Sequence, residues 1–263
     1  MDINRIYNEN CIDTMRKMDD GSIDLVVTSP PYDDLRTYNG YSFDVDAISA
    51  EMYRVMGDGR IVVWVVGDAC VNGSETGTSF KQALRFMEVG FKLHDTMIYE
   101  KNSSSFPARP DSKRYTQIFE YMFVFCKGKI RDDITLIADK RNKWSGHQSW
   151  GVVTYYKKNG ELDARDRKIS PVPEFSLRNN IWKYSTAVGE SFGHPAVFPE
   201  KLAEDHILSW SNPGDLVYDP FMGSGTTAKM AMVNGRRWIG SEISGEYCKI
   251  IQRRLSNVQV NLL

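Results

Sequence analysis

Residues 215–227 read DLVYDPFMGSGTT, and this stretch decides the fold of the chain. It predicts a short apolar strand over 215–218, a turn that contains two glycines, and a helix over 226–233. Glycine lets the backbone approach a ligand closely, and α/β sheets bind nucleotide-type ligands at the carboxyl ends of their parallel strands. The stretch therefore predicts an α/β fold with a ligand site at this turn.

An acidic residue after the next strand supports the ligand site. Residues 238–240 begin that strand and Glu242 follows it, where a carboxylate can accept hydrogen bonds from ribose hydroxyls. The turn is not a P-loop, because no Gly-Lys-Ser/Thr follows it. It also differs from the dinucleotide-binding motif G-x-G-x-x-G, because Ala228 occupies the position of the third glycine, although that motif tolerates alanine there. The alternative is a plain strand–helix turn with an exposed Glu242, but the combined layout favours the ligand site.

Predicted strands and helices alternate through the rest of the chain. Apolar runs predict strands over residues 23–27, 61–66, 97–99 and 121–125. Helical spacing of apolar residues predicts helices over 47–56, 80–87, 200–210 and 246–255. In the second of these helices the spacing is carried by Phe80, Ala83, Leu84 and Met87. The alternation indicates a doubly wound α/β fold with a mostly parallel sheet.

A basic and aromatic segment interrupts the pattern after residue 127. We therefore expect a first half over 1–127, an insertion over 128–180, and a second half over 181–263 that carries the glycine turn. Between Lys101 and Lys183 the chain has 17 basic and 9 acidic residues, although its net charge is −1. Such a segment can meet phosphate, but a solvated surface explains the charge equally well. The candidates for phosphate contacts are Arg141, Lys143, Lys157, Lys158, Arg165, Arg167 and Lys168.

A second turn, Ser29-Pro30-Pro31-Tyr32, follows the first apolar run. Prolines lack backbone donors, so the Ser29 hydroxyl and the Pro30 carbonyl can both accept hydrogen bonds from one amino group. These two hydrogen bonds would favour a pyramidal geometry at the nitrogen of a conjugated amine and direct its lone pair towards an electrophile. Tyr32 offers an aromatic face on which a base can stack. Taken alone, the turn also fits an ordinary structural loop.

Together these motifs resemble the amino-methylating DNA methyltransferases of bacteria and phages, which use S-adenosylmethionine. The order resembles the class in which the catalytic motif comes first, the target-recognition region second and the cofactor motif last. The resemblance covers nearly the whole chain and is carried by residues 27–32, 194–199 with Leu202, 212–215 and 219–227. It implies the S-adenosylmethionine-dependent methyltransferase fold with an inserted target-recognition region. It also implies methyl transfer to the exocyclic amine of a flipped base in double-stranded DNA.

The resemblance implies roles for single residues as well. The catalytic residues would be Ser29, Pro30, Pro31 and Tyr32. The cofactor-binding residues would be Asn10, Phe198, Pro199, Asp219, Phe221, Gly223, Gly225, Thr226 and Glu242. Asn10 departs from the aspartate that the family often has there, and its amide carries no charge. Ser29 in the first motif position favours N4 of cytosine as the target, with N6 of adenine as the alternative.

Composition disfavours several other classes. The sequence contains no run of eighteen apolar residues and therefore predicts no membrane span. Its four scattered cysteines include no CxxC pair, which argues against a zinc cluster or a disulfide framework and fits a reducing cytoplasm. No cysteine follows a proline, which disfavours methylation at carbon 5 of cytosine. An RNA or protein methyltransferase and a non-catalytic DNA-binding relative are less favoured alternatives. A cognate restriction endonuclease as a partner and the oligomeric state stay open.

Overall fold

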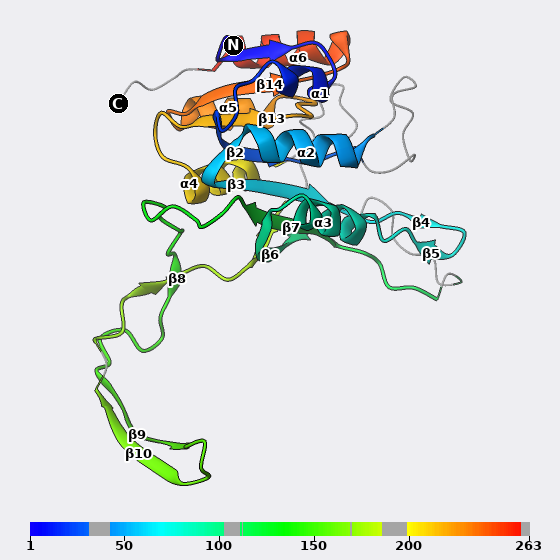
Figure 1. Ribbon diagram of the computed structural model, residues 1–263. Coiled ribbons are helices and arrows are strands. Elements are labelled where there is room, and N and C mark those ends of the chain that lie inside the picture. Colours follow the sequence, from blue (N-terminus) through cyan, green and yellow to red (C-terminus); the bar gives the residue numbers. More distant parts are fainter. Residues whose placement is uncertain (32–42, 103–110, 112, 169, 186–198, 259–263) are drawn as a thin grey trace. The chain divides into compact units, whose positions relative to one another are not determined.

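The computed structural model describes residues 1–31, 43–102, 111, 113–168, 170–185 and 199–258, without the side chains of 149–153 and 164–168. The chain forms two compact units, residues 1–135 with 180–263 and residues 136–179. The first unit contains a large sheet between helices, and the second contains two pairs of short strands (Figure 1). The second unit lies within the bounds expected for the insertion, residues 128–180.

The large sheet has eight strands among the described residues, in the order β1-β14-β13-β2-β3-β7-β6-β12. In that order they span Arg5–Tyr7, Arg237–Ser241, Leu216–Asp219, Ile23–Thr28, Met56–Val66, Phe119–Cys126, Lys92–Lys101 and Ile181–Tyr184. Within these eight strands, β7 runs antiparallel to its neighbours β3 and β6, and every other adjacent pair is parallel. The predicted mostly parallel sheet is therefore confirmed.

Helices cover both faces of this sheet (Figure 1). Their bounds are α1 Cys11–Arg16, α2 Val45–Val55, α3 Thr78–Glu88, α4 Glu200–Trp210, α5 Thr226–Val233 and α6 Gly245–Ser256. In β3, Val62 and Trp64 join the core formed with α1, α2 and α3, whereas Val63 and Val65 join the core formed with α4, α5 and α6. Alternate side chains of one strand thus enter two cores, because successive residues point to opposite faces. The doubly wound arrangement is confirmed.

Helix α3 forms as predicted but buries a different face. Phe80 and Leu84, which the apolar spacing would place inside, are 52% and 58% exposed. Gln82 is buried instead, because its Oε1 accepts a hydrogen bond from Trp64 Nε1 at 2.7 Å. The buried face carries Ala83 and Phe86, whose ring lies 4.7 Å from that of Trp64 and 4.9 Å from that of Phe125, and Gln82 can be buried beside them because its hydrogen bond is satisfied.

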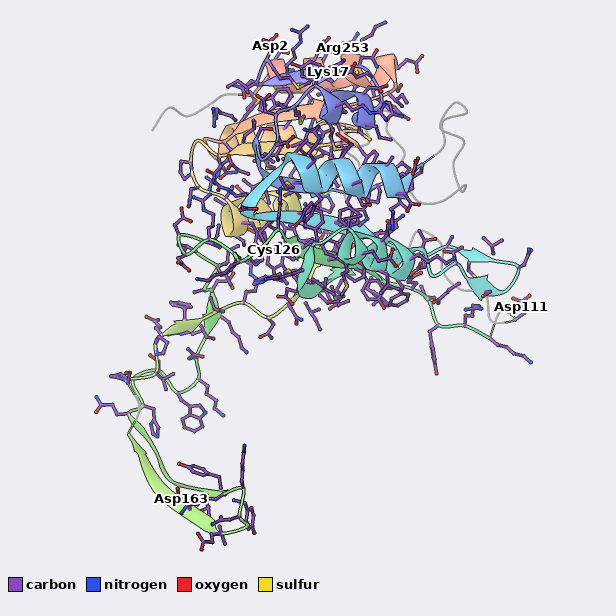
Figure 2. All side chains as sticks on the ribbon, viewed as in Figure 1. Asp2, Lys17, Asp111, Cys126, Asp163 and Arg253 are labelled. Carbon is purple, nitrogen blue, oxygen red and sulfur yellow. The ribbon has the colours of Figure 1, made fainter. Side chains whose placement is uncertain are left out.

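The second unit is built from short antiparallel pairs. Strand β8 (Lys140–Arg141) pairs with β11 (Phe175–Ser176), and β9 (Ser149–Tyr156) pairs with β10 (Leu162–Lys168). None of these four strands belongs to the large sheet, and the described side chains project from them rather than packing between layers (Figure 2). A further small pair, β4 (Cys70–Val71) with β5 (Ser74–Glu75), belongs to the first unit.

Membrane spans and metal clusters are both missing from the described residues. Among them, no helix is both long and apolar enough to cross a membrane. No group of three or more His, Cys, Asp or Glu side chains in the described part of the chain could hold a metal ion. The four cysteines are free thiols, with Cys70 exposed and the other three buried.

Candidate active site

The turns after β2 and β13 lie beside each other at one edge of the large sheet. The two strands are adjacent and parallel, so their carboxyl ends point the same way. The hydroxyl of Thr28 donates a hydrogen bond to Asp219 Oδ1 at 2.7 Å, and the hydroxyl of Thr227 donates to the carbonyl of Val27 at 3.1 Å. Hydrogen bonds therefore join the end of β2, which leads into Ser29, to the residues that begin and follow the glycine turn, although Thr28 and Asp219 are 191 positions apart in the sequence.

Asp219 is a buried carboxylate at the centre of this contact. It is 5% exposed, and its Oδ1 also accepts the backbone N–H of Phe221 at 3.0 Å. Burial raises the pKa of Asp219 to about 6, even though the hydrogen bonds from Thr28 and Phe221 act in the opposite direction. One carboxylate thus fixes the start of the glycine turn and the end of β2. Its contact with a cofactor stays a prediction.

The raised pKa predicts a pH dependence of stability that Asp219→Asn should remove. The folded pKa, about 6, lies above the ordinary value of 3.8, so the folded state binds this proton more tightly than the unfolded state. The group therefore stabilises the fold increasingly as the pH falls through 6 towards 4. The asparagine oxygen can still accept from Thr28 and Phe221. Thermal unfolding of both proteins should be measured at about pH 7.5 and about pH 5. The unfolding midpoint of the wild type, relative to that of the variant, should be higher at the lower pH. A pH-independent difference between their midpoints would contradict the assignment.

The glycine turn requires glycine for its backbone conformation. Gly223 and Gly225 have φ of +52° and +80°, a region that side chains with a Cβ rarely adopt. A Cβ on Gly225 would lie 2.8 Å from Cγ2 of Ile251, a fully buried residue of α6. Gly225 caps α5, and Thr226 is the first residue of that helix. The turn therefore packs closely on α6 and leads directly into the amino end of α5.

Glu242 connects the end of β14 to the glycine turn. Its Oε2 accepts the N–H of Gly223 at 2.9 Å, and its Oε1 accepts the N–H of Ser244 at 2.8 Å. Burial raises the pKa of this carboxyl, which is 8% exposed, so the alternative of an exposed Glu242 is wrong. A carboxylate has about four acceptor positions, and these two bonds leave room for hydroxyl groups of a ribose. The residues present therefore fit a nucleoside-type cofactor.

Asn10 caps helix α1 close to this site. Its Oδ1 accepts the N–H of Ile12 at 2.9 Å, while the neighbouring Asn8 donates to the carbonyl of Glu242 at 2.8 Å. An amide oxygen has two lone pairs, so the cap leaves one acceptor position on Asn10. Its predicted contact with adenine stays a prediction. The link from Asn8 to Glu242 was not predicted from the sequence.

The structure describes only part of the predicted catalytic and cofactor segments. Ser29 and Pro31 are half-buried, and Pro30 is buried. Pro199 is buried and caps α4. Two predicted residues lie outside the described residues, namely Tyr32 and Phe198.

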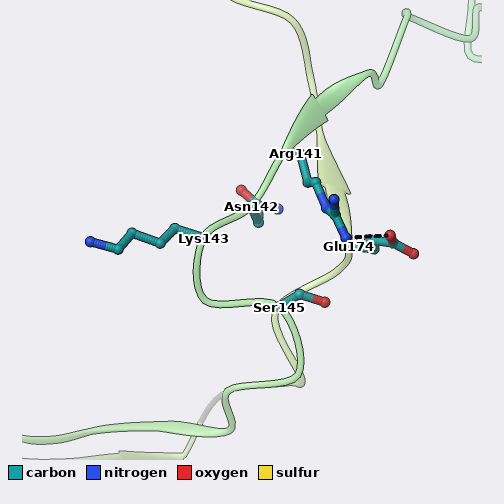
Figure 3. A pocket seen from close by; sticks show the side chains of 5 residues that line it. All are labelled: Arg141, Asn142, Lys143, Ser145 and Glu174. Atoms are coloured by element: carbon teal, nitrogen blue, oxygen red, sulfur yellow. Dashed lines mark ion pairs between the residues drawn. The ribbon is translucent and has the colours of Figure 1, made fainter.

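The basic residues predicted to contact phosphate lie in the second unit. Arg141 forms an ion pair with Glu174 at 3.8 Å, and Lys143 points away from that pair (Figure 3). A pocket of about 430 Å³ in this unit is lined by Arg141, Asn142, Lys143, Ser145 and Glu174. Lys157 and Lys158 are exposed. The remaining candidates, whose side chains lie outside the described residues, are Arg165, Arg167 and Lys168.

The part of the chain that contains both turns matches the model of one protein family. A family model described as DNA methylase, covering N6 and N4 methylases, matches residues 23–253. The chain belongs to the N6/N4 DNA methylase family. The match begins at the strand before the Ser-Pro-Pro-Tyr turn and includes Asp219 and Glu242, whereas Asn10 precedes it.

This DNA methylase also resembles individual proteins along most of its length. It is 59% identical over 244 residues to the orphan methyltransferase M.BamHII of Bacillus amyloliquefaciens, and the match covers 90% of each chain. Its fold is similar to that of the cytosine-N4-specific PvuII DNA methyltransferase, with a TM-score of 0.70, 21% identity, and coverage of 98% of this chain and 87% of that chain. It is also similar to TTHA0409 of Thermus thermophilus in complex with S-adenosyl-L-methionine, with a TM-score of 0.63, 21% identity, and coverage of 96% and 94%. The two structures show the fold that this DNA methylase shares.

Proposed function

We propose that this DNA methylase transfers a methyl group from S-adenosylmethionine to the exocyclic amine of a base flipped out of double-stranded DNA, with N4 of cytosine as the preferred target. The observation that carries the proposal is the hydrogen bond from Thr28 to Asp219. It holds the predicted catalytic turn next to the predicted cofactor turn, and such proximity favours direct transfer between two bound groups.

The residues of the two turns have complementary tasks in this proposal. S-adenosylmethionine, when bound, would supply a methyl group on a sulfonium: the amine nitrogen would form the new bond to carbon as the methyl–sulfur bond breaks to a neutral thioether, and the nitrogen would release one proton to solvent. The Ser29 hydroxyl and the Pro30 carbonyl accept hydrogen bonds from that amine and stabilise the positive charge that develops on its nitrogen. Tyr32 stacks on the base, which must leave the duplex to reach it. Glu242 binds the ribose through its remaining acceptor positions.

The product identifies both the function and the target base. Ser29 offers a neutral acceptor, and by the family resemblance a serine in this position accompanies N4-cytosine methylation. Incubation of duplex DNA with the protein and labelled S-adenosylmethionine, followed by nucleoside mass spectrometry, should therefore yield N4-methylcytosine. N6-methyladenine as the sole product would overturn the choice of base and leave the transfer mechanism intact. Label in neither base, or label in RNA or polypeptide instead, would refute the function.

We also propose that the enzyme works in the cytoplasm without a cognate restriction endonuclease. The 59%-identical relative is named an orphan methyltransferase, which supports the absence of a cognate endonuclease. A restriction endonuclease encoded beside this chain, whose cleavage is blocked by its methylation, would contradict the proposal.

The second unit is proposed to bind phosphate groups of the duplex, which predicts a change in salt dependence. Lys157→Ala with Lys158→Ala should lower the slope of log K for duplex binding against log salt by about 0.9 for each phosphate that is no longer neutralised. Both lysines are exposed on the hairpin of β9 and β10. Fluorescence anisotropy at several salt concentrations measures the slope. Lys249→Ala, an exposed lysine on α6, is the control and should leave the slope unchanged. Equal slopes in all proteins would exclude the two hairpin lysines.

A further inference from the structure

Helix α6 carries a buried arginine whose hydrogen bonds lead to the glycine turn. The Arg254 side chain is 4% exposed, and a guanidinium keeps its charge, so its burial requires partners. Its Nη1 donates to the carbonyl of Ser224 at 2.9 Å, to the hydroxyl of Ser224 at 3.0 Å and to the hydroxyl of Thr226 at 3.0 Å. Ser224 and Thr226 are the residues on either side of Gly225.

The same guanidinium reaches the beginning of helix α4. Its Nη2 donates to Glu200 Oε1 at 2.6 Å, and Lys229 in the first turn of α5 donates to the same oxygen at 2.5 Å. Burial alone would raise the pKa of Glu200, but the bonds from Lys229 and Arg254 outweigh burial and lower that pKa. Glu200 directly follows Pro199, the cap of α4. One ionic cluster therefore connects α4, α5 and α6 where the glycine turn meets them.

We infer that Arg254 is a positioning residue that holds the glycine turn against the start of α4 and thereby sets the affinity for S-adenosylmethionine. This inference rests on the proposed function, in which the glycine turn and Pro199 belong to the cofactor site. Glycine restrains its own backbone weakly, so a turn with Gly223 and Gly225 needs external fixation to stay in one conformation. Arg254 provides that fixation through its contacts with Ser224 in the turn and with Thr226 at the start of α5, and Glu200 orients the guanidinium.

Two substitutions test the inference on the whole 263-residue chain. Arg254→Lys keeps the charge but cannot reproduce the forked geometry, and Glu200→Gln keeps an acceptor but removes the charge. Each should weaken S-adenosylmethionine binding, measured by calorimetry, by about 10- to 100-fold, the range for removal of a hydrogen bond to a charged group. Turnover at saturating cofactor should stay near that of the wild type, because neither residue touches the reacting groups. The effect should thus appear in KM for the cofactor and not in kcat.

A second buried arginine provides the matched control. Arg236 is 9% exposed and donates from Nη2 to the carbonyl of Ser211 at 2.6 Å and from Nε to its hydroxyl at 3.1 Å. It lies just beyond the carboxyl end of α5, whereas Thr226 and Arg254 meet at the amino end. Arg236→Lys should lower the thermal midpoint as Arg254→Lys does, but it should leave the cofactor Kd unchanged.

Each outcome decides the inference. Unchanged cofactor affinity in a folded Arg254→Lys protein, or an equal loss in Arg254→Lys and Arg236→Lys, would overturn it. If Arg254→Lys does not fold, Glu200→Gln alone decides, and unchanged affinity in that variant overturns the inference. Glu242→Ala separates this failure from failure of the proposed function. Unchanged affinity in Glu242→Ala as well would show that the cofactor site itself is misplaced.

Discussion

Gly225→Ala should abolish tight S-adenosylmethionine binding and lower the free energy of unfolding by about 2–5 kcal/mol. The backbone strain arises because φ is +80° at this residue, and the added Cβ would overlap Cγ2 of Ile251 at 2.8 Å. Ile251 is fully buried, so it cannot move aside without disturbing α6. Calorimetric titration with the cofactor and urea unfolding measure the two effects.

Gly235→Ala is the matched control for that substitution. Gly235 has φ of +72°, but a Cβ there would meet no atom within 4 Å. The variant should therefore lose only the strain energy of about 1–2 kcal/mol and should bind the cofactor normally. Equal loss of cofactor affinity in both variants would mean that the effect comes from general destabilisation and not from the turn.

Tyr32→Ala should reduce methyl transfer by the equivalent of roughly 1–3 kcal/mol and leave cofactor affinity intact. The reason is the loss of the face on which the flipped base is proposed to stack. Single-turnover methylation of a duplex measures the chemical step, and calorimetry measures cofactor binding. Tyr32→Phe preserves the ring and should retain most of the rate. A Tyr32→Phe protein as slow as Tyr32→Ala would show that the hydroxyl and not the face of the ring matters.

Elements with a strong local pattern could be predicted from the sequence. Helix α5 begins and ends at the predicted residues, because Gly225 precedes a continuous helical segment. The strand predicted over 61–66 is part of β3, since a run buried on both faces is apolar at every position. Strand β1 and helix α1 were missed, because three and six residues are too few to show a period.

Features that depend on distant partners could not be predicted. The buried face of α3 depends on contacts with other elements, in which Phe86 packs on Trp64 and Phe125 and Gln82 accepts a hydrogen bond from Trp64. The hydrogen bond from Thr28 to Asp219 and the contacts of Arg254 with the glycine turn were not predicted, because they arise only when strands and helices far apart in the sequence pack together. The sequence placed Thr28 in the motif before Ser29, as a hydroxyl residue at the end of a buried strand, but could not show its partner.

The self-contained strand pairs of the second unit have an evolutionary consequence. Strands β8 to β11 pair only with one another among the described strands, so residues 136–179 contribute no hydrogen bonds to the ladder of the large sheet. Insertions, deletions and substitutions in this unit should therefore leave the register of β2, β13 and β14 unchanged. Descendants of one enzyme could then exchange this unit, which the family resemblance implies is the target-recognition region, while the two turns proposed to carry the chemistry are inherited without alteration.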